Sequence, residues 1–446
     1  MINLFESFDI RTQRLYKTFE NAKVNVQTIV IEEDGFLPSN VITPYQFFAN
    51  NDDHASKPLF FNQVPLPRFW EIGGNNNSAE IKNMGEVKGR IIYKKNYGFR
   101  IVERIEWLNK QGRTQVIDYY NDKGLKYAQL MVDDNQRRII KRWFNDRNEE
   151  IISENFVTND IMLKWNDKEY IFQSKVQFVI FYLKMSETPL ESFLVNSLSI
   201  PFAVLHDLKV EGHDYLYWQE QMKDHLPGNM KLMLADKTRG SKILVPSNEE
   251  YDKVRELVEY EHQSRIAKAG YVYEFKNNHK EARNVLTLTN SDQIPHIEDI
   301  VKAHPQYQFH IAAITGMSQK LLQLNKYHNV TLYPVATKEK IHTLYETCDI
   351  YLDINKGNEI LDAIKVAFEH KLLILGYKET VHNADYIAKE NQFSLEHKDQ
   401  LINALKEIEA EPSLADTKRE IQLKHASSIQ AQAFEALFSN ICVNKE

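Results

Sequence analysis

Cysteine is scarce in this chain, which has only two, Cys348 and Cys442, among 446 residues. They lie far apart in the sequence and neither belongs to a metal-ligand spacing. We therefore expect small buried side chains in a reducing cytosol rather than a disulfide framework. No apolar run approaches the roughly 20 residues that a membrane helix needs. The start of the chain also lacks the basic and then apolar segments of a secretory signal.

The motifs of several enzyme classes are missing too. The chain contains no Gly-x-Gly-x-x-Gly, no P-loop and no Asp-x-Asp pair. Its 15 histidines form no His-x-x-x-His or zinc-like cluster, which argues against metal catalysis. The net charge of −7 argues against a nucleic-acid surface, because such a surface needs a basic stripe. We therefore expect no cofactor, no metal and no nucleic-acid partner.

The composition is that of a globular protein with many aromatic residues. Charged residues make up 26% and hydrophobic residues 43% of the chain, and its length suffices for two or three domains that each bury a core. The 22 tyrosines and 23 phenylalanines fit extensive sheet surface and interfaces.

A repeated turn pattern marks the region from about 85 to 184. In each copy an aromatic strand end runs into Asn or Asp and then usually into Gly or Asn, residues that tolerate the positive φ angles of tight turns. The copies are 107–112, 119–124, 143–148 and, more loosely, 164–169. The repeat predicts a meandering antiparallel sheet. Its exposed edge and aromatic faces would be covered either by a partner subunit or by the rest of the chain.

The segments on either side of this region read as alternating helices and strands. Before it, residues 12–21 predict a helix and 26–31 a strand. After it, residues 186–197 and 215–225 predict helices and 200–205 a strand. The sheet region thus interrupts a single α/β unit.

From residue 285 the pattern becomes regular, with continuous apolar strands between amphipathic helices. The expected strands are 285–289, 309–315, 330–335, 350–354 and 372–376, and the expected helices are 297–304, 317–328, 338–347, 358–370, 397–411 and 414–438. This alternation predicts a doubly wound parallel sheet. Ligands of such sheets lie at the carboxyl ends of the strands, here at 289–292, 315–317 and 355–359.

The segment 354–376 resembles the donor site of a retaining glycosyltransferase built from two Rossmann-like halves. That site carries two glutamates eight positions apart, and the alignment places Asn358 and Val366 there. A valine cannot accept a hydrogen bond from a sugar or ribose hydroxyl. The turn after the first strand of this half carries Asn290 and has neither Arg nor Lys, where active relatives supply cations for the leaving diphosphate. The donor site is therefore expected to be degenerate.

Two residues could replace part of what is missing. Lys356 could supply one cation, and Glu359, shifted by one position, could imitate the first carboxylate, but no side chain replaces the second. In the first half, His206 follows an expected strand and either touches an acceptor or is a polar loop residue. Its neighbour Asp207 cannot orient it, because adjacent residues of an extended segment point to opposite sides. The candidate acceptor-binding residues are His206, Lys356, Asn358 and Glu359.

Several stretches are similar to one family, and the resemblance spans essentially the whole chain. They are residues 1–6, 28–38, 42–45 and 225–230, together with the hairpin insert. They resemble the glycosyltransferase-stabilising protein of the accessory Sec system of Gram-positive bacteria. The resemblance implies an α/β protein with two Rossmann-like halves, a GT-B-like glycosyltransferase fold, and an inserted extended antiparallel β-sheet domain. The expected domains are a first half at 1–65 and 186–265, the sheet domain at 66–185 and a second half at 266–446.

The resemblance also implies a function. Members of this family are non-catalytic partners of a peptide N-acetylglucosaminyltransferase, which they join through the β-sheet domain in a hetero-oligomer. They hold the Ser/Thr-rich polypeptide of serine-rich repeat adhesins while the catalytic subunit adds the first GlcNAc from UDP-GlcNAc. The implied location is the cytoplasm, peripherally on the inner face of the cell membrane. Two other functions stay open: an active retaining glycosyltransferase with an atypical donor site, and a purely structural stabiliser.

Overall fold

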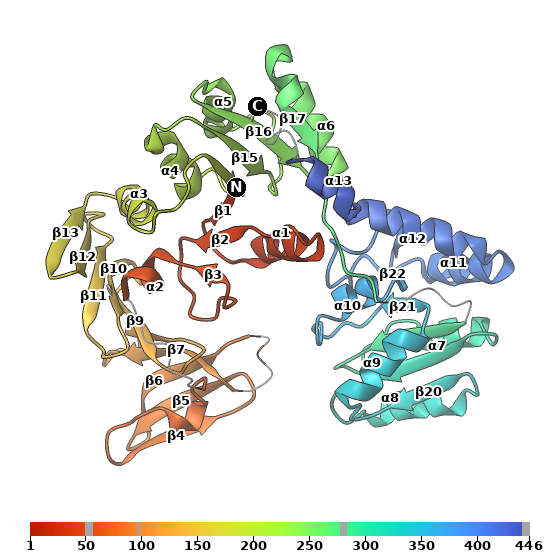
Figure 1. Cartoon of the computed structure of the whole chain (residues 1–446). Coiled ribbons are helices and arrows are strands. Elements are labelled where there is room, and N and C mark those ends of the chain that lie inside the picture. Colours follow the sequence, from red (N-terminus) through yellow and green to blue (C-terminus); the bar gives the residue numbers. More distant parts are fainter. Residues whose placement is uncertain (50–56, 96, 98–99, 277–282, 439–446) are drawn as a thin grey trace. The chain divides into compact units, whose positions relative to one another are not determined.

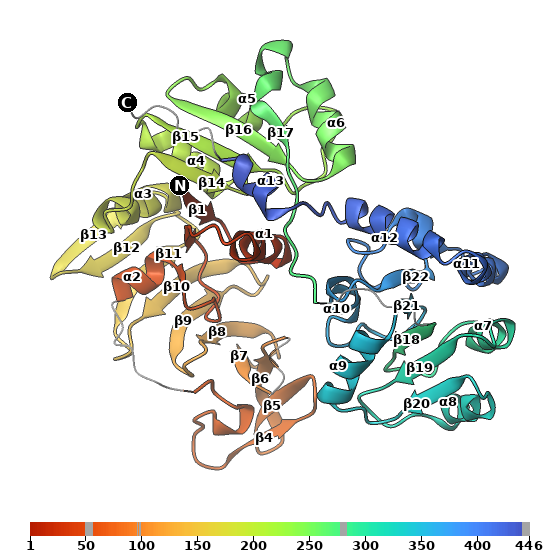
Figure 2. The same ribbon diagram turned by 45° about the vertical axis from the view of Figure 1, so that its right-hand side comes forward.

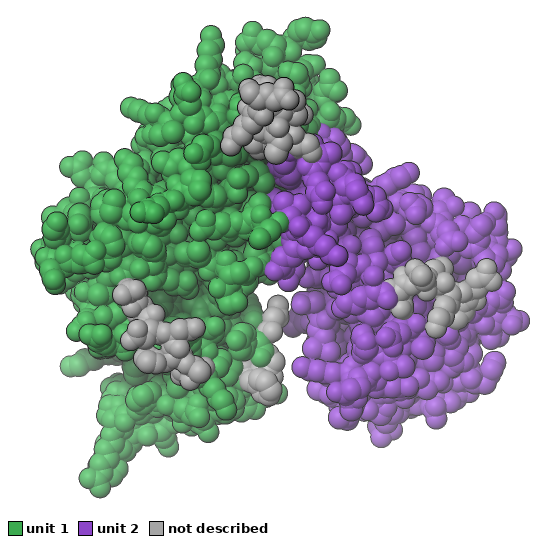
Figure 3. Space-filling model, viewed as in Figure 1, with its two compact units in different colours: residues 1–16, 25–245, 250–267 green, residues 17–24, 246–249, 268–446 purple. Residues whose placement is uncertain are grey.

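Three β-sheets organise the described part of the chain (Figure 1). The structure is a computed structural model that describes residues 1–49, 57–95, 97, 100–276 and 283–438. Contacts divide the chain into two units (Figure 3). Unit 1 comprises residues 1–16, 25–245 and 250–267, and unit 2 comprises residues 17–24, 246–249 and 268–446.

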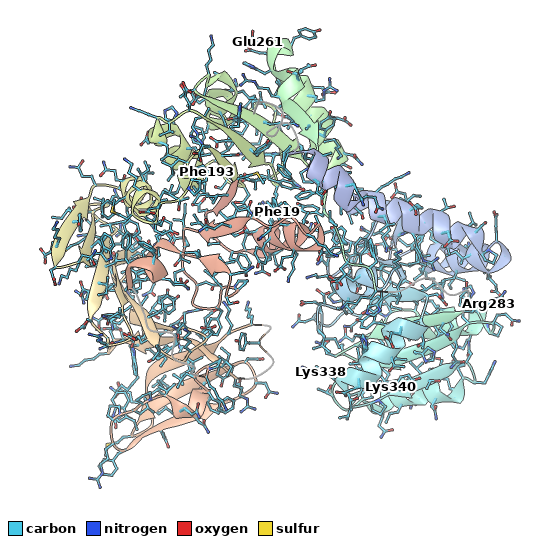
Figure 4. The ribbon with its side chains drawn as sticks, in the orientation of Figure 1. Phe19, Phe193, Glu261, Arg283, Lys338 and Lys340 are labelled. Atoms are coloured by element: carbon cyan, nitrogen blue, oxygen red, sulfur yellow. The ribbon has the colours of Figure 1, made fainter. Side chains whose placement is uncertain are left out.

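The first sheet belongs to unit 1 and has seven strands. In spatial order these are β17 (Ile266–Lys268), β16 (Arg239–Val245), β15 (Gly212–Tyr217), β14 (Ser192–Val195), β1 (Ile2–Phe5), β2 (Gln27–Val30) and β3 (Val41–Ile42). The pairings from β16 to β3 are all parallel. β1 and β14 are buried along their whole length, and Phe193 of β14 is fully buried (Figure 4). Burial on both faces is what a parallel sheet covered by helices requires.

The helices around this sheet correct part of the sequence-based prediction. They are α1 (Ile10–Asn21), α2 (Pro44–Ala49), α3 (Lys175–Met185), α4 (Ile200–Leu208), α5 (Gly228–Ala235) and α6 (Asn248–Leu257). The helix expected at 12–21 and the strand expected at 26–31 are confirmed by α1 and β2. The helix expected at 186–197 is wrong, because β14 lies there, and the strand expected at 200–205 is α4. Residues 215–225 were expected to be helical but form the end of β15 and a loop.

The ten-stranded sheet is an antiparallel meander in which each strand pairs with its neighbours in sequence. Its strands are β4 (Trp70–Gly74), β5 (Ser78–Asn83), β6 (Glu86–Tyr93), β7 (Val102–Leu108), β8 (Thr114–Tyr120), β9 (Lys126–Val132), β10 (Arg138–Phe144), β11 (Glu150–Asn155), β12 (Ile161–Trp165) and β13 (Lys168–Phe172). The four repeated turns predicted from the sequence lie between strands of this sheet. Gly112, Gly124, Asn148 and Asn166 all have positive φ, which confirms the chemistry of the repeat.

Part of the meander packs on the first half of the chain. Buried residues of β9 to β12, among them Trp143 and Leu163, share one core with α2, α3 and the parallel sheet of unit 1. The rings of Tyr45 and Trp143 stack with centroids 4.2 Å apart. The strands nearer β4 build a smaller core of their own around Ile81 and Ile91. The rest of the chain therefore covers part of the sheet, while β4 and β13 remain its two edges.

Unit 2 contains the doubly wound sheet that the sequence predicts. Its strands, in spatial order, are β20 (Val330–Tyr333), β19 (Gln308–Ala312), β18 (Asn284–Leu288), β21 (Ile350–Asp353), β22 (Leu373–Tyr377) and β23 (Gln392–Phe393). All pairings are parallel. The helices are α7 (Ile297–Ala303), α8 (Gln319–Leu322), α9 (Lys338–Thr347), α10 (Ala363–Glu369), α11 (Lys398–Ala410), α12 (Ser413–His425) and α13 (Ala431–Ala436).

Helices lie on both faces of this sheet (Figure 2). Two separate hydrophobic cores fill the space between the helices and the two faces. Along β21, Ile350 and Leu352 belong to the core shared with α7 and α11, whereas Tyr351 belongs to the core shared with α9 and α10. This burial on both faces explains why the strands of this sheet are mostly apolar. Three helix predictions need correction. The helix expected at 358–370 begins only at Ala363, and the one expected at 414–438 is divided into α12 and α13. The helix expected at 317–328 is the short α8, followed by a 3-10 helix at Gln323–Lys326.

The remaining compositional predictions concern cysteine and the membrane. Cys348 is buried, and burial raises the pKa of its thiol to about 12, so that it remains a protonated apolar side chain. Cys442 lies outside the described residues. Among the helices that the structure describes, none is both long and apolar enough to cross a membrane.

Candidate binding sites at the carboxyl edges of the two parallel sheets

The loops that follow β18 and β21 are hydrogen-bonded to each other at the carboxyl edge of the second sheet. The Thr289 hydroxyl donates to Asn355 Oδ1 (2.9 Å), and the same oxygen accepts from the Gly357 N–H (3.0 Å). Asn355 Nδ2 lies 3.5 Å from Asn290 Oδ1. A Cβ on Gly357 would collide with the Asn290 side chain. Polar groups here are thus largely satisfied by one another, and the loops pack too closely to admit a larger residue at 357.

A charged pair holds the same loop from the other side. Asp353, the last residue of β21, is buried and lies 2.5 Å from Nδ1 of His382. The backbone N–H of His382 also donates to Asp353 Oδ2 (2.9 Å), and its Nε2 contacts the Gly357 carbonyl (2.7 Å). The hydrogen bond to Asp353 raises the pKa of His382 to about 9. The imidazole is therefore protonated at neutral pH and donates through both nitrogens, one of them to the carbonyl of the loop.

The predicted residues of this edge do not converge on a ligand position. Asn358 and Lys356 are exposed. Glu359 has a structural role, because its Oε1 accepts a hydrogen bond from the Ile364 N–H (2.9 Å) in the first turn of α10. Burial raises the pKa of this carboxyl. Val366 is half-buried and packs on the apolar core beneath α10. No helix begins at Asn358, so the helix terminus expected there is absent.

A polar pocket lies at the carboxyl edge of the first sheet. It has a volume of about 180 Å³ and is lined by residues from the segments after β1, β14 and β15 and from the start of α1. Glu6 follows β1 and accepts hydrogen bonds from the hydroxyls of Ser197 (2.6 Å) and Ser199 (3.0 Å). Asn196 follows β14 and donates to the Thr12 hydroxyl (2.8 Å) and to Gln219 Oε1 (3.4 Å). Carboxylate, amide and hydroxyl groups thus converge where a parallel sheet binds its ligands.

His206 does not belong to this pocket. It lies on the exposed side of α4 and stacks on Phe202 of the same helix, with ring centroids 5.9 Å apart. The pocket itself was missed because 192–195 was read as helix. With a strand there, the rule that places ligands at strand ends would have selected Asn196 and Ser197 from the sequence.

This architecture places the chain in the class of proteins with the GT-B fold of glycosyltransferases. Such proteins consist of two Rossmann-like halves, and in this chain an antiparallel sheet is inserted in the first half. Among solved structures, the pneumococcal O-GlcNAc transferase GtfA in complex with UDP and GlcNAc shares this fold, with a TM-score of 0.52, 13% identity and coverage of 99% of this chain and 98% of that one.

Family models narrow the assignment. The GtfB N-terminal domain matches residues 2–48, the GtfB middle domain 70–173, the GtfB third domain 175–257 and the GftB/GlyA-F C-terminal domain 285–422. A UDP-N-acetylglucosamine–peptide N-acetylglucosaminyltransferase stabilising protein GtfB of Streptococcus agalactiae is 39% identical over 92% of both chains. A chain in a crystal structure of a GtfA/B complex bound to UDP and GlcNAc is 37% identical, with a TM-score of 0.90 over 98% of this chain and 99% of that one. The chain belongs to the GtfB family of glycosyltransferase-stabilising proteins.

Proposed function

We propose that this protein is the non-catalytic subunit of a UDP-GlcNAc:peptide transferase complex and holds the Ser/Thr-rich acceptor while its partner transfers the first GlcNAc. The acceptor would be an unfolded serine-rich repeat adhesin polypeptide in the cytoplasm. A relative named as a stabilising protein and the similar chain in a GtfA/B complex support the role beside a transferase. The polar pocket of the first sheet is the observation that carries the acceptor-binding part.

The chemistry of the pocket suits hydroxyl-bearing side chains. Glu6 already accepts hydrogen bonds from two serine hydroxyls of its own chain, and Asn196 donates to a threonine hydroxyl. An extended Ser/Thr-rich peptide offers the same groups and little apolar area, so its affinity comes from hydrogen bonds spread along the edge. The acceptor contacts predicted from the sequence, His206, Lys356, Asn358 and Glu359, do not line the polar pocket and are not part of this proposal.

The acceptor proposal can be tested by filling the pocket. Ser7 lines it and is exposed, so Ser7→Trp should place an indole at its mouth without disturbing a core. We expect its affinity for an unglycosylated Ser/Thr-rich peptide to fall at least tenfold in a calorimetric titration. Ser413→Trp, at an exposed serine of α12, is the matched control and should bind as wild type. Equal affinity of the two variants would contradict the proposed pocket.

The second half is proposed to lack donor chemistry. Asn290 and Asn355 bond with neighbouring loop residues instead of a diphosphate, Glu359 binds a helix N–H, and Val366 packs on a core. Calorimetric titration of UDP-GlcNAc into the isolated chain should therefore give no binding at micromolar concentrations. Tight stoichiometric binding would refute the pseudoenzyme assignment.

An active retaining glycosyltransferase is the second candidate, because the C-terminal family model also covers the GlyA-F group. Streptococcus pneumoniae GlyF, named a glycosyltransferase, is 32% identical over 31% of this chain. The degenerate donor positions argue against transfer by this chain. Incubating this chain alone with UDP-GlcNAc and acceptor decides between a non-catalytic subunit and an active transferase. Transfer at the rate of the two-subunit mixture would favour the active transferase.

The catalytic partner is proposed to dock on the inserted sheet domain, which we place at 66–185. Among the described residues, its edge strands β4 and β13 each pair with a strand on one side only, and Phe69 before β4 and Met84 after β5 are 80% and 97% exposed. Met84→Glu should weaken co-purification with the catalytic subunit. Tyr260→Glu, at a side chain that is 91% exposed outside the sheet, is the control and should leave it unchanged. The reverse order of effects would place the interface elsewhere.

A further inference from the structure

A second cavity, larger than the polar pocket, lies in unit 1 between the parallel sheet and the meander. Its volume is about 360 Å³. One wall is the segment that follows β2, with Glu33, Leu37 and Val41. The opposite wall comes from the turn between β8 and β9 and from the end of β10, with Leu125 and Phe144. The cavity thus exists only because the inserted sheet packs against the first half.

The walls of this cavity are half apolar, unlike those of the polar pocket. Leu37 and Val41 are buried, and the stacked rings of Tyr45 and Trp143 also line it. Glu33 is the one buried carboxylate among the described residues that line the cavity, and it is bonded within its own chain: Oε1 accepts from the Gly35 N–H (2.8 Å) and Oε2 from the Thr43 hydroxyl (2.7 Å). Burial raises the pKa of Glu33 to about 7. Below that pH the carboxyl is mostly neutral and compatible with an apolar occupant.

The cavity and the polar pocket lie along the same edge of one sheet. The polar pocket is lined by residues that follow β1, and the cavity by residues that follow β2, its neighbour in the sheet. The chain segments after β1 and β2 remain hydrogen-bonded beyond the ends of the two strands, because the Glu32 N–H donates to the Glu6 carbonyl (2.9 Å). Glu6 lines the polar pocket and Glu33, next to Glu32, lines the cavity.

We propose that this cavity is a second subsite for the acceptor polypeptide and takes an aliphatic side chain that lies about three residues from the hydroxyl residue in the polar pocket. The spacing follows from the strand order. Residues after β15, β14 and β1 line the polar pocket, and the middle strand of these three, β14, lies two strand separations from β2. Two separations of about 5 Å make about 10 Å, which an extended chain covers in about three residues at about 3.3 Å each. The inference rests on the proposed acceptor binding and adds to it a preference for particular acceptor sequences. An acceptor with isolated aliphatic residues among its serines binds more tightly than one without.

The test compares two labelled peptides by fluorescence anisotropy with the full-length chain. The first contains only Ser, Thr and Gly, and the second carries one Leu three residues from a central Ser. Ser39→Trp fills the cavity from its exposed rim, and Ser413→Trp is the control. We expect the Leu peptide to bind wild type and control about tenfold more tightly. In Ser39→Trp this advantage should vanish while the affinity for the Leu-free peptide stays within twofold.

The possible results separate the two proposals. Equal binding of both peptides by wild type, or a Leu advantage that survives in Ser39→Trp, overturns the aliphatic subsite and leaves the acceptor proposal standing. An advantage that is the same for Leu at every position refutes the spacing and with it the subsite. Failure of both peptides to bind wild type overturns acceptor binding itself, and this inference with it.

Discussion

Two glycines with nearly equal positive φ offer a controlled test of how the meander is joined to the first half. Gly35 and Gly85 have φ of +78° and +82°. A Cβ on Gly85 would meet nothing within 4 Å, so Gly85→Ala costs only the left-handed penalty, about 1 kcal/mol. A Cβ on Gly35 would lie 2.7 Å from a ring carbon of Tyr127 and 2.9 Å from the Tyr120 carbonyl. Overpacking against backbone adds about 2 kcal/mol, which gives a total of about 3 kcal/mol for Gly35→Ala.

Thermal unfolding measures the difference between the two variants. For a unit of this size we expect Gly85→Ala to lower Tm by about 2–4 °C and Gly35→Ala by about 6–12 °C. Hydrogen exchange locates the effect, because the Asp122 N–H donates to the Gly35 carbonyl (2.8 Å) and should lose protection only in Gly35→Ala. Equal Tm values and equal exchange at Asp122 in the two variants would refute the idea that the close packing of Gly35 against the turn between β8 and β9 stabilises the junction between the meander and the first half.

Three further predictions concern buried charges. Because the pKa of Glu33 is raised to about 7 from 4.5, the folded state loses stability as pH rises through that interval. Glu33→Gln should therefore melt higher than wild type at pH 8 but not at pH 4. The pKa of His382 is raised to about 9 from 6.5, so its bond to Asp353 stabilises fully below pH 6.5 and is lost as pH rises through 9. His382→Gln should lower Tm at pH 6 and have no effect at pH 10. Arg239 is buried and donates to Asp214 through two nitrogens (2.6 and 2.8 Å). Arg239→Met should cost about 3–5 kcal/mol in urea unfolding, and a second change, Asp214→Leu, should restore part of it.

Most of unit 2 and of the meander could be predicted from the sequence for physical reasons. Strands such as β21 are buried on both faces, so Ile350, Tyr351 and Leu352 form a hydrophobic run before Asp353, and the strand stands out between amphipathic helices. The hairpin turns need positive φ, which restricts them to Asn, Asp and Gly and makes the repeat visible.

The region after the meander was predicted poorly because short apolar runs are ambiguous between helix and strand. The run that begins at Ile200 is α4, and the overlooked signal is Pro201, which suits the first turn of a helix and not a central strand. The helix after β21 was placed five residues too early. Leu361 and Asp362 have positive φ, and Glu359 folds back onto the Ile364 N–H, features that periodicity does not carry.

The position of the meander within the chain also fixes an order of folding during synthesis. Its strands join only sequence neighbours, whereas β1 needs β14, which is translated after the meander is complete. Pairings between strands close in the sequence form quickly and distant ones slowly, so the strands of the insert can pair as they leave the ribosome. Until β14 is synthesised, the edge of β1 that pairs with it has no partner strand. A nascent chain halted between Phe172 and Ser192 should therefore carry a folded insert beside an unfinished first half, the stage at which chaperone protection matters most.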